Sequence, residues 1–245
     1  MRKDLTEGTI LRNIIHTGYP MVIALAVETF YNVVDSIYVG RLSANALGAV
    51  AMAFPIMMIL FAIAGCVGVG ANSVMARLIG QKEREKAKAV AAHALLLGAA
   101  ISIIVSAAGY YLAKPMLLMM GAGELLELSW QYTSVIFLGS LFLIMFTIIN
   151  NIFRADGDSK TPMKAMLIAT GFNIIMDPVF IFLLGLGVRG AAIATVLADM
   201  TGTAIMLWML YKRSSLAPDF TKFKASMRTV AEIFKTGVPG ALSQL

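Results

Sequence analysis

The segment Val22–Gly40 has the sequence VIALAVETFYNVVDSIYVG. Together with the residues before it, it is long and apolar enough to cross a membrane as a helix, yet it carries Glu28, Asn32 and Asp35. At about 100° per residue, the spacings of four and seven place these three side chains on one face. A charge at the centre of a bilayer costs ~2.5–3.5 kcal/mol on insertion scales. We therefore expect this face to meet a protein interior or a water-filled cavity.

The composition is that of an integral membrane protein. Of the 245 residues, 59% are hydrophobic and 14% are charged, whereas soluble domains carry about 25% charged residues. The net charge of +6 does not indicate a nucleic-acid partner, because the basic residues lie in short connections between apolar segments. The single cysteine, Cys66, lies within an apolar segment and is predicted to be a packing residue.

Six apolar segments are long enough to span a bilayer as helices. Their approximate limits are 14–39, 46–73, 89–113, 129–153, 163–187 and 188–211. The short alternating strands of a membrane barrel, each about ten residues long, are not indicated. The sequence therefore predicts an all-α, six-transmembrane-helix bundle.

The basic residues are distributed unevenly between the two ends of this bundle. Sixteen of the 20 Lys and Arg residues lie in the amino-terminal tail or after the second, fourth and sixth segments, whereas only Arg41, Lys114 and Arg189 lie at the other end. Basic residues accumulate on the cytoplasmic side of membrane proteins. We expect a multi-pass protein of the cytoplasmic membrane, with a cytoplasmic amino terminus and a charged cytoplasmic loop at Arg77–Lys88.

A short repeat indicates a second structural unit. IIHTGYP at Ile14–Pro20 recurs as IFKTGVP at Ile233–Pro239, and both copies follow a basic segment and begin an apolar one. Six spans separate them, as in transporters built from parallel repeats. We expect a first lobe at 1–211, a linker at 212–229, and the start of a seventh helix and a second lobe at 230–245. The alternative is a chance match at the end of a complete six-helix protein.

Four acidic residues lie within the predicted spans, at Glu28, Asp35, Asp177 and Asp199, without Lys or Arg in the hydrophobic centres to pair with them. An unpaired buried carboxylate takes up a proton or holds a cation, since either removes the charge. Such residues are typical of ion pathways.

Asp177 has the most polar neighbourhood in its own helix. Thr170 and Asn173 share its face, and Pro178 leaves the carbonyl of Ile174 without its helical donor. These are hard oxygen ligands, which suit Na⁺ or a proton relay. A hydrogen-bonded aspartate at a kink is the structural alternative.

The other acids leave more than one interpretation open. Asp199 is flanked at four-residue spacing by Thr195 and Thr203, which fits either a cation site or a neutral polar contact between helices. Glu28 fits a cavity or a protonated packing residue. Tyr31 and Asn32 give Asp35 the surroundings of a cavity wall.

No motif for an enzyme is found in the sequence. Ser-His-Asp, Cys-His, HExxH, GxSxG and Walker signatures are absent. We therefore expect neither catalysis nor an organic cofactor.

Several motifs occur in order along nearly the whole chain: Pro20 with Phe30–Gly40, Gly68–Ser73 with Arg77–Gly80, Phe153–Met163, Asn173–Pro178 and Gly187–Thr195. These motifs resemble those of one transporter family, the multidrug and toxic compound extrusion (MATE) transporters.

The resemblance implies one lobe of a two-lobed, twelve-helix antiporter with a central cleft. Such a protein exports organic, often cationic, compounds in exchange for H⁺ or Na⁺. By motif position, the family places its coupling-ion site at Asp35, Asn173, Asp177 and Thr195, with Tyr31 and Asn32 beside it. Glu28 and Asp199 depart from the family pattern, and either shift the balance towards protons or add a second cation position.

Three other functions fit the sequence less well. A flippase for lipids or lipid-linked glycans, in the same superfamily, would line its cleft with basic residues, whereas these spans contain acids. An intramembrane enzyme would need a catalytic pair that the spacing does not offer. A scaffold without transport would not explain four acids in the membrane.

Overall fold

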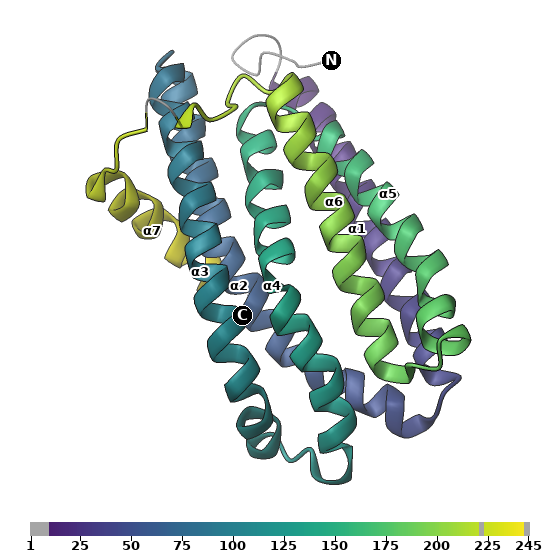
Figure 1. Ribbon diagram of the computed structural model, residues 1–245. Helices are drawn as coiled ribbons and strands as arrows, with labels where there is room; N and C mark the ends of the chain where they lie inside the picture. The colour runs from purple at the N-terminus through teal and green to yellow at the C-terminus, as the bar shows by residue number, and fades with distance from the viewer. Residues whose placement is uncertain (1–9, 221–222, 243–245) are drawn as a thin grey trace.

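A computed structural model describes residues 10–220 and 223–242 of the chain. Within these ranges the fold is helical, without strands. The main helices, shown in Figure 1, are α1 (Ile10–Gly40), α2 (Ala44–Gly80), α3 (Arg84–Met119), α4 (Leu126–Ala155), α5 (Lys160–Pro178), α6 (Gly187–Arg213) and α7 (Met227–Leu242). Two short elements join them, the 3₁₀ turn η1 (Gly123–Leu125) and the π-helical turn η2 (Val179–Leu183). The tail residues Arg2 and Lys3, and residues 243–245 of the expected second lobe, lie outside the described residues.

The six predicted spans are confirmed as helices of membrane-crossing length and hydropathy. The expected loop at Arg77–Lys88 is wrong in extent, because α2 continues to Gly80 and α3 begins at Arg84. Charged residues here continue the helices past the apolar segments, and the ion pairs Lys86–Glu83 and Lys88–Glu85 form at helical spacing. Only a three-residue turn remains, in which Lys82 adopts a left-handed φ of 62°.

The helices pack in two groups that meet along α4 and α6. In Figure 1, α1, α5 and α6 lie on one side, and α2, α3 and α4 lie on the other. α1 packs chiefly on α5, α5 on α6, α6 on α4, and α4 on both α2 and α3. α4 is therefore the centre of the bundle, and its Ile144, Ile148 and Ile152 are fully buried.

Three glycines at the contacts of α4 with α3 and α6 allow these helices to approach each other closely. A Cβ at Gly98 of α3 would collide with Ile148, one at Gly109 of α3 with Phe137, and one at Gly139 of α4 with Val196 of α6. In a bilayer, small residues at helix contacts favour association through close van der Waals packing. These contacts fix the position of α4 relative to its neighbours.

The connection between α5 and α6 is sharply defined. Pro178 ends α5, η2 follows, and Gly185 and Gly187 both adopt positive φ in the turn that leads to α6. Gly190 then packs so closely on this turn that a Cβ there would lie 2.5 Å from the carbonyl oxygen of Phe180. The first turn of α6 is thus pressed against the backbone that follows Asp177.

Gly190→Ala is expected to destabilise the bundle because the atom it meets is backbone and cannot rotate away. Overpacking of this kind costs about 1–3 kcal/mol, and we expect a lower melting temperature of the detergent-solubilised protein. Gly171→Ala in α5 is the matched control, since a Cβ there has no neighbour within 4 Å. Equal melting temperatures for the two variants would contradict this account of the turn.

Candidate cation-binding site

Asn173 and Asp177 lie one turn apart on α5, and both side chains are buried, at 1% and 0% exposure. With the Asn173 amide oriented to satisfy both of its ends, its nitrogen donates to Asp177 Oδ2 at 2.8 Å. Its oxygen accepts from the backbone N–H of Thr195 on α6 at 3.2 Å. Asn173 therefore connects the carboxylate of α5 to the backbone of α6.

Thr195 connects α6 to α1. Its hydroxyl donates to the carbonyl of Ala191 at 3.0 Å, one turn earlier in the same helix. The Tyr31 hydroxyl lies 3.1 Å from Thr195 Oγ1. Because the proton of Thr195 is already directed at Ala191, Tyr31 is the donor in this contact. Three helices thus meet through a chain of polar contacts from Tyr31 to Asp177.

Asp35 completes the cluster from α1 and is 7% exposed. It is close enough to Asp177 to interact with it electrostatically. Oδ1 of Asp35 and Oδ1 of Asp177 are both buried, and neither accepts a hydrogen bond from the described residues. Buried polar atoms normally have partners, so two acids with one unpaired oxygen each indicate a place for a proton or a cation.

Glu28 and Asp199 form a second acid pair, because they also interact electrostatically and are partly buried. Glu28 lies about two turns from Asp35 on α1, and Asp199 about one turn from Thr195 on α6. Since α1 and α6 run in opposite directions, both displacements are towards the same end of the bundle. The second pair is therefore adjacent to the first, at a different depth.

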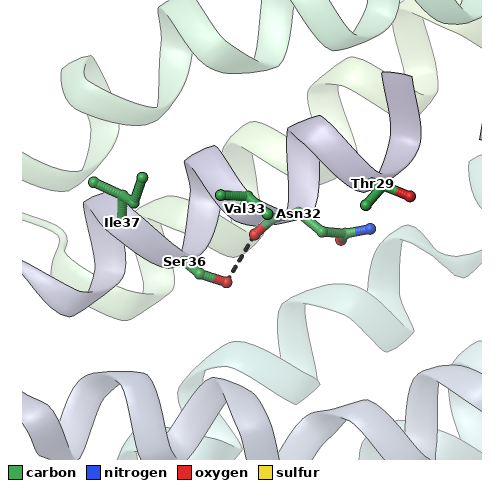
Figure 2. A pocket seen from close by; sticks show the side chains of 5 residues that line it. All are labelled: Thr29, Asn32, Val33, Ser36 and Ile37. Carbon is green, nitrogen blue, oxygen red and sulfur yellow. Dashed lines mark hydrogen bonds between the residues drawn. The ribbon is translucent and has the colours of Figure 1, made fainter. Parts of the chain in front are cut away.

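Asn32 is the one predicted residue that the structure places away from these acids. Its side chain is exposed and donates to the carbonyl of Glu28 at 3.0 Å. Figure 2 shows it beside Ser36, whose hydroxyl donates to the Asn32 carbonyl at 2.7 Å. An open depression on the outer face of α1 is lined by Thr29, Asn32, Val33, Ser36 and Ile37.

Tyr132 of α4 belongs to the site, although the sequence did not single it out. It is 6% exposed and lies within electrostatic range of Asp35, Asp177 and Asp199. Tyrosines near the ends of membrane helices usually anchor the protein at the interface. A tyrosine at the start of a span therefore carries no sequence signal for a site.

The donor set is chemically uniform. The side chains of the cluster are carboxylates, an amide, a hydroxyl and phenols, and no described Lys or Arg forms an ion pair with either aspartate. Hard oxygen donors suit Na⁺ or a proton rather than a soft metal. Among the described residues, no three or more His, Cys, Asp or Glu side chains are grouped so that they could hold a metal ion.

Comparison with known proteins gives a clear result. The sequence model of the MatE family matches residues 20–179, which is more than half of the chain. Among curated proteins, the multidrug export protein MepA of Staphylococcus aureus is 30% identical over 242 residues, covering 98% of this chain and 54% of MepA. The chain therefore spans about half the length of the curated relatives it matches.

Two solved structures are similar to the chain. A multidrug resistance MATE family transporter in an outward-facing conformation has a TM-score of 0.92 at 33% identity, covering 97% of this chain and 53% of that one. An inward-facing MATE family transporter has a TM-score of 0.84 at 32% identity, covering 91% and 53%. These matches confirm the predicted six-helix lobe, and the chain belongs to the MatE family of multidrug efflux transporters.

Proposed function

We propose that this chain is the amino-terminal lobe of a secondary active antiporter that exports organic, often cationic, compounds in exchange for Na⁺ or H⁺. The relatives supply the transporter class, and their length supports a second lobe as the partner of this one. The observation that carries the proposal is the pair of buried, unpaired oxygens on Asp35 and Asp177.

This pair provides a means of coupling. Two neighbouring carboxylates away from water cannot both remain charged without a cation or a proton between them. Asn173, Thr195 and Tyr31 hold the pair in place through contacts that join α1, α5 and α6. Binding of a cation therefore draws the three helices together, and its release lets the two aspartates repel each other.

α1 is the helix best able to respond. It packs chiefly on α5, and much of its remaining surface is exposed, including Leu25, Phe30 and Val33. A helix held on one side moves at lower cost than the enclosed α4. Loading and unloading of the site then bias a two-state equilibrium between outward-open and inward-open forms.

The second acid pair adds a position for positive charge. Glu28 and Asp199 lie beside the coupling site and have no described basic partner, so we propose that they take a second coupling cation or a proton. Tyr31 and Tyr132 lie within range of Asp35 and Asp199 and therefore connect the two positions. Positive charge at one position lowers the affinity for positive charge at the other.

Acids rather than bases in the membrane interior also favour cationic cargo. The basic residues of the described helices lie towards helix ends, among them Arg77, Lys114, Arg154 and Arg189. A flippase for anionic lipid-linked glycans would need basic groups deeper in the lobe.

Asp35→Asn and Asp177→Asn are each expected to abolish coupled efflux, because each removes one of the two charges that hold the cation. The measurement is efflux of a fluorescent organic cation from cells producing the complete transporter, at matched amounts of protein in the membrane. Glu124→Gln is the control, since it removes an exposed carboxylate in η1 far from the site. Wild-type efflux in both aspartate variants would refute the mechanism.

The same variants identify the coupling ion. If Na⁺ is coupled, purified wild-type protein binds radioactive sodium, the aspartate variants do not, and a sodium gradient drives transport at constant pH. If H⁺ is coupled, sodium binding is absent and a pH gradient alone drives transport.

The orientation in the membrane has its own test. We propose that the turn at 81–83 is cytoplasmic and that the η1 turn is extracellular. In a Cys66→Ala background, Gln81→Cys should resist a membrane-impermeant thiol reagent added to intact cells and react in inverted vesicles. Glu124→Cys should show the opposite pattern. The reverse result for both positions would place the amino terminus outside.

A further inference from the structure

α7 does not occupy the same position as its sequence repeat. The repeated motif lies in α1 around Pro20 and in α7 around Pro239, but α1 packs on α5 whereas α7 packs on α2. α7 therefore does not complete the six-helix lobe. It lies across the outside of the half of α2 that ends at Gly80.

Two glycines form the centre of this crossing. A Cβ at Gly70 of α2 would collide with the carbonyl of Ile233, and a Cβ at Gly237 of α7 would collide with the carbonyl of Cys66. The backbones of the two helices are therefore in direct contact. Gly70 also belongs to the Gly68–Gly80 motif, which the cation site does not use.

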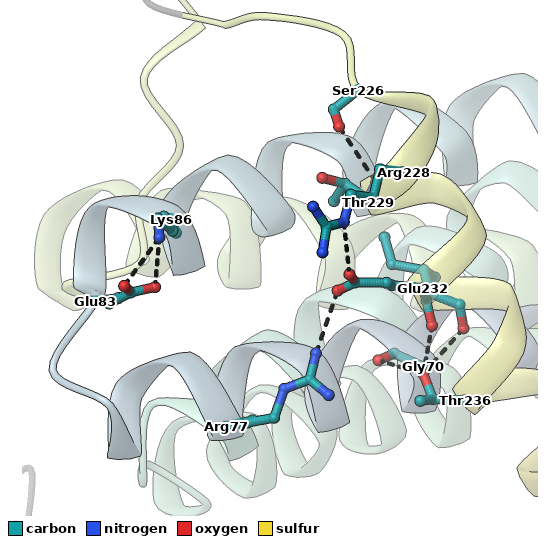
Figure 3. A network of polar contacts seen from close by, with 10 residues as sticks. Gly70, Arg77, Glu83, Lys86, Ser226, Arg228, Thr229, Glu232 and Thr236 are labelled. Carbon is teal, nitrogen blue, oxygen red and sulfur yellow. Dashed lines mark hydrogen bonds and ion pairs between the residues drawn. The ribbon is translucent and has the colours of Figure 1, made fainter.

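Polar contacts extend the crossing towards the end of α2. Figure 3 shows Glu232 of α7 between two arginines, 3.2 Å from Arg77 Nη2 and 3.4 Å from Arg228 Nε. Thr236 donates to the carbonyl of Glu232 at 2.9 Å and also reaches the carbonyl of Gly70 at 3.3 Å. Of these contacts, Arg77–Glu232 and Thr236–Gly70 join α7 to α2.

The beginning of α7 is fastened to a different helix. Nδ1 of His93, a buried residue of α3, lies 2.7 Å from the Ala89 carbonyl, and its Nε2 accepts the backbone N–H of Ser226 at 2.9 Å. The ring of Phe223 packs against the imidazole with centroids 4.6 Å apart. His93 thus anchors the linker directly before Met227.

We infer that the α2–α7 crossing is the cytoplasmic closure of the transport path, a contact held by Arg77–Glu232 in the outward-open form and broken in the inward-open form. This inference rests on the proposed transport function. α7 would swing about its anchored start at His93, so that Gly237 moves away from Gly70 while Ser226 stays in place.

The polar contacts of the crossing are of a kind that separates readily. The Arg77 and Glu232 side chains are 57% and 38% exposed, and an exposed ion pair contributes little to stability. Gly70 and Gly237 meet backbone to backbone, whereas Ile233 of α7 is fully buried in the hydrophobic core and must leave it when the crossing opens. The chain also resembles the outward-facing relative more closely than the inward-facing one, with TM-scores of 0.92 and 0.84 over 97% and 91% of its length.

Charge reversal tests the closure without requiring transport. In the complete transporter with its native cysteines replaced, Thr236→Cys reports access to the crossing from the cytoplasmic side. Arg77→Glu places two acids opposite each other and should raise labelling of Thr236→Cys in inverted vesicles severalfold. The exchanged pair Arg77→Glu with Glu232→Arg should return labelling to the parent level.

The control is the reversal of Lys114 and Glu127, an ion pair of similar length at the other end of the bundle. Lys114→Glu should leave labelling unchanged. If Arg77→Glu does not accumulate in the membrane, Gly70→Ala replaces it, with Gly80→Ala as its control because a Cβ there has no neighbour within 4 Å. Parent-level labelling in the reversed variant, or no recovery in the exchanged pair, would overturn the closure.

A crosslink separates this inference from the proposed function. Arg77→Cys and Glu232→Cys, joined by a short reducible thiol-specific linker, should arrest efflux, and reduction should restore it. Undiminished efflux by the crosslinked protein would refute the closure while leaving antiport intact. If the unmodified protein transports nothing, the proposed function fails, and the labelling result still decides whether the crossing opens.

Discussion

The constraint on which this structure depends is the burial of two carboxylates within electrostatic range of each other in a membrane. Asp35 and Asp177 come from helices far apart in sequence, and each has one oxygen without a described partner. Each charge at such depth costs ~2.5–3.5 kcal/mol on insertion scales, and the proximity of the two adds to that cost. A protein that keeps this arrangement must have a partner for the charge, and a mobile cation is one that can arrive and leave.

The packing around the pair is correspondingly uneven. α4 is enclosed on several sides and held by glycine contacts at Gly98, Gly109 and Gly139. α1 brings Asp35 to the site but is supported chiefly by α5. Electrostatic repulsion between the two aspartates therefore acts on α1, the helix with the fewest packing contacts around the site. A rigid centre and a loosely held edge are what an ion-driven change of shape requires.

Much of this architecture follows from the sequence for physical reasons. Hydropathy predicts spans because a bilayer admits few alternatives to helices, and acids in spans indicate a site because they are costly elsewhere. The ends of the helices cannot be predicted from hydropathy, because charged residues such as Arg84 and Lys88 continue a helix beyond its apolar segment. Periodicity placed Asn32 on the face of Asp35, but the two are about 60° apart, and packing on α5 separates them. Tyr132 could not be identified as a site residue from the sequence, because its role depends on which helices pack against α4 at its position.

α4 lies between the candidate cation site and α2, the helix on which α7 packs, and it contacts residues on both sides. Towards the site, α4 supplies Tyr132 and accepts the Thr203 hydroxyl at the Phe142 carbonyl, 2.9 Å away. Towards α2, the backbone carbonyl of Asn151 in α4 accepts a hydrogen bond from the side-chain amide of Asn72 in α2, at 3.1 Å. The Asn151 side chain also packs against Gly68 of α2. In the proposed mechanism, α1, α5 and α6 move relative to the enclosed α4, and α7 moves relative to α2, which packs on the other side of α4. Coupling between ion and closure then needs no continuous series of switching residues, only two arrangements of helices packed around a common rigid member.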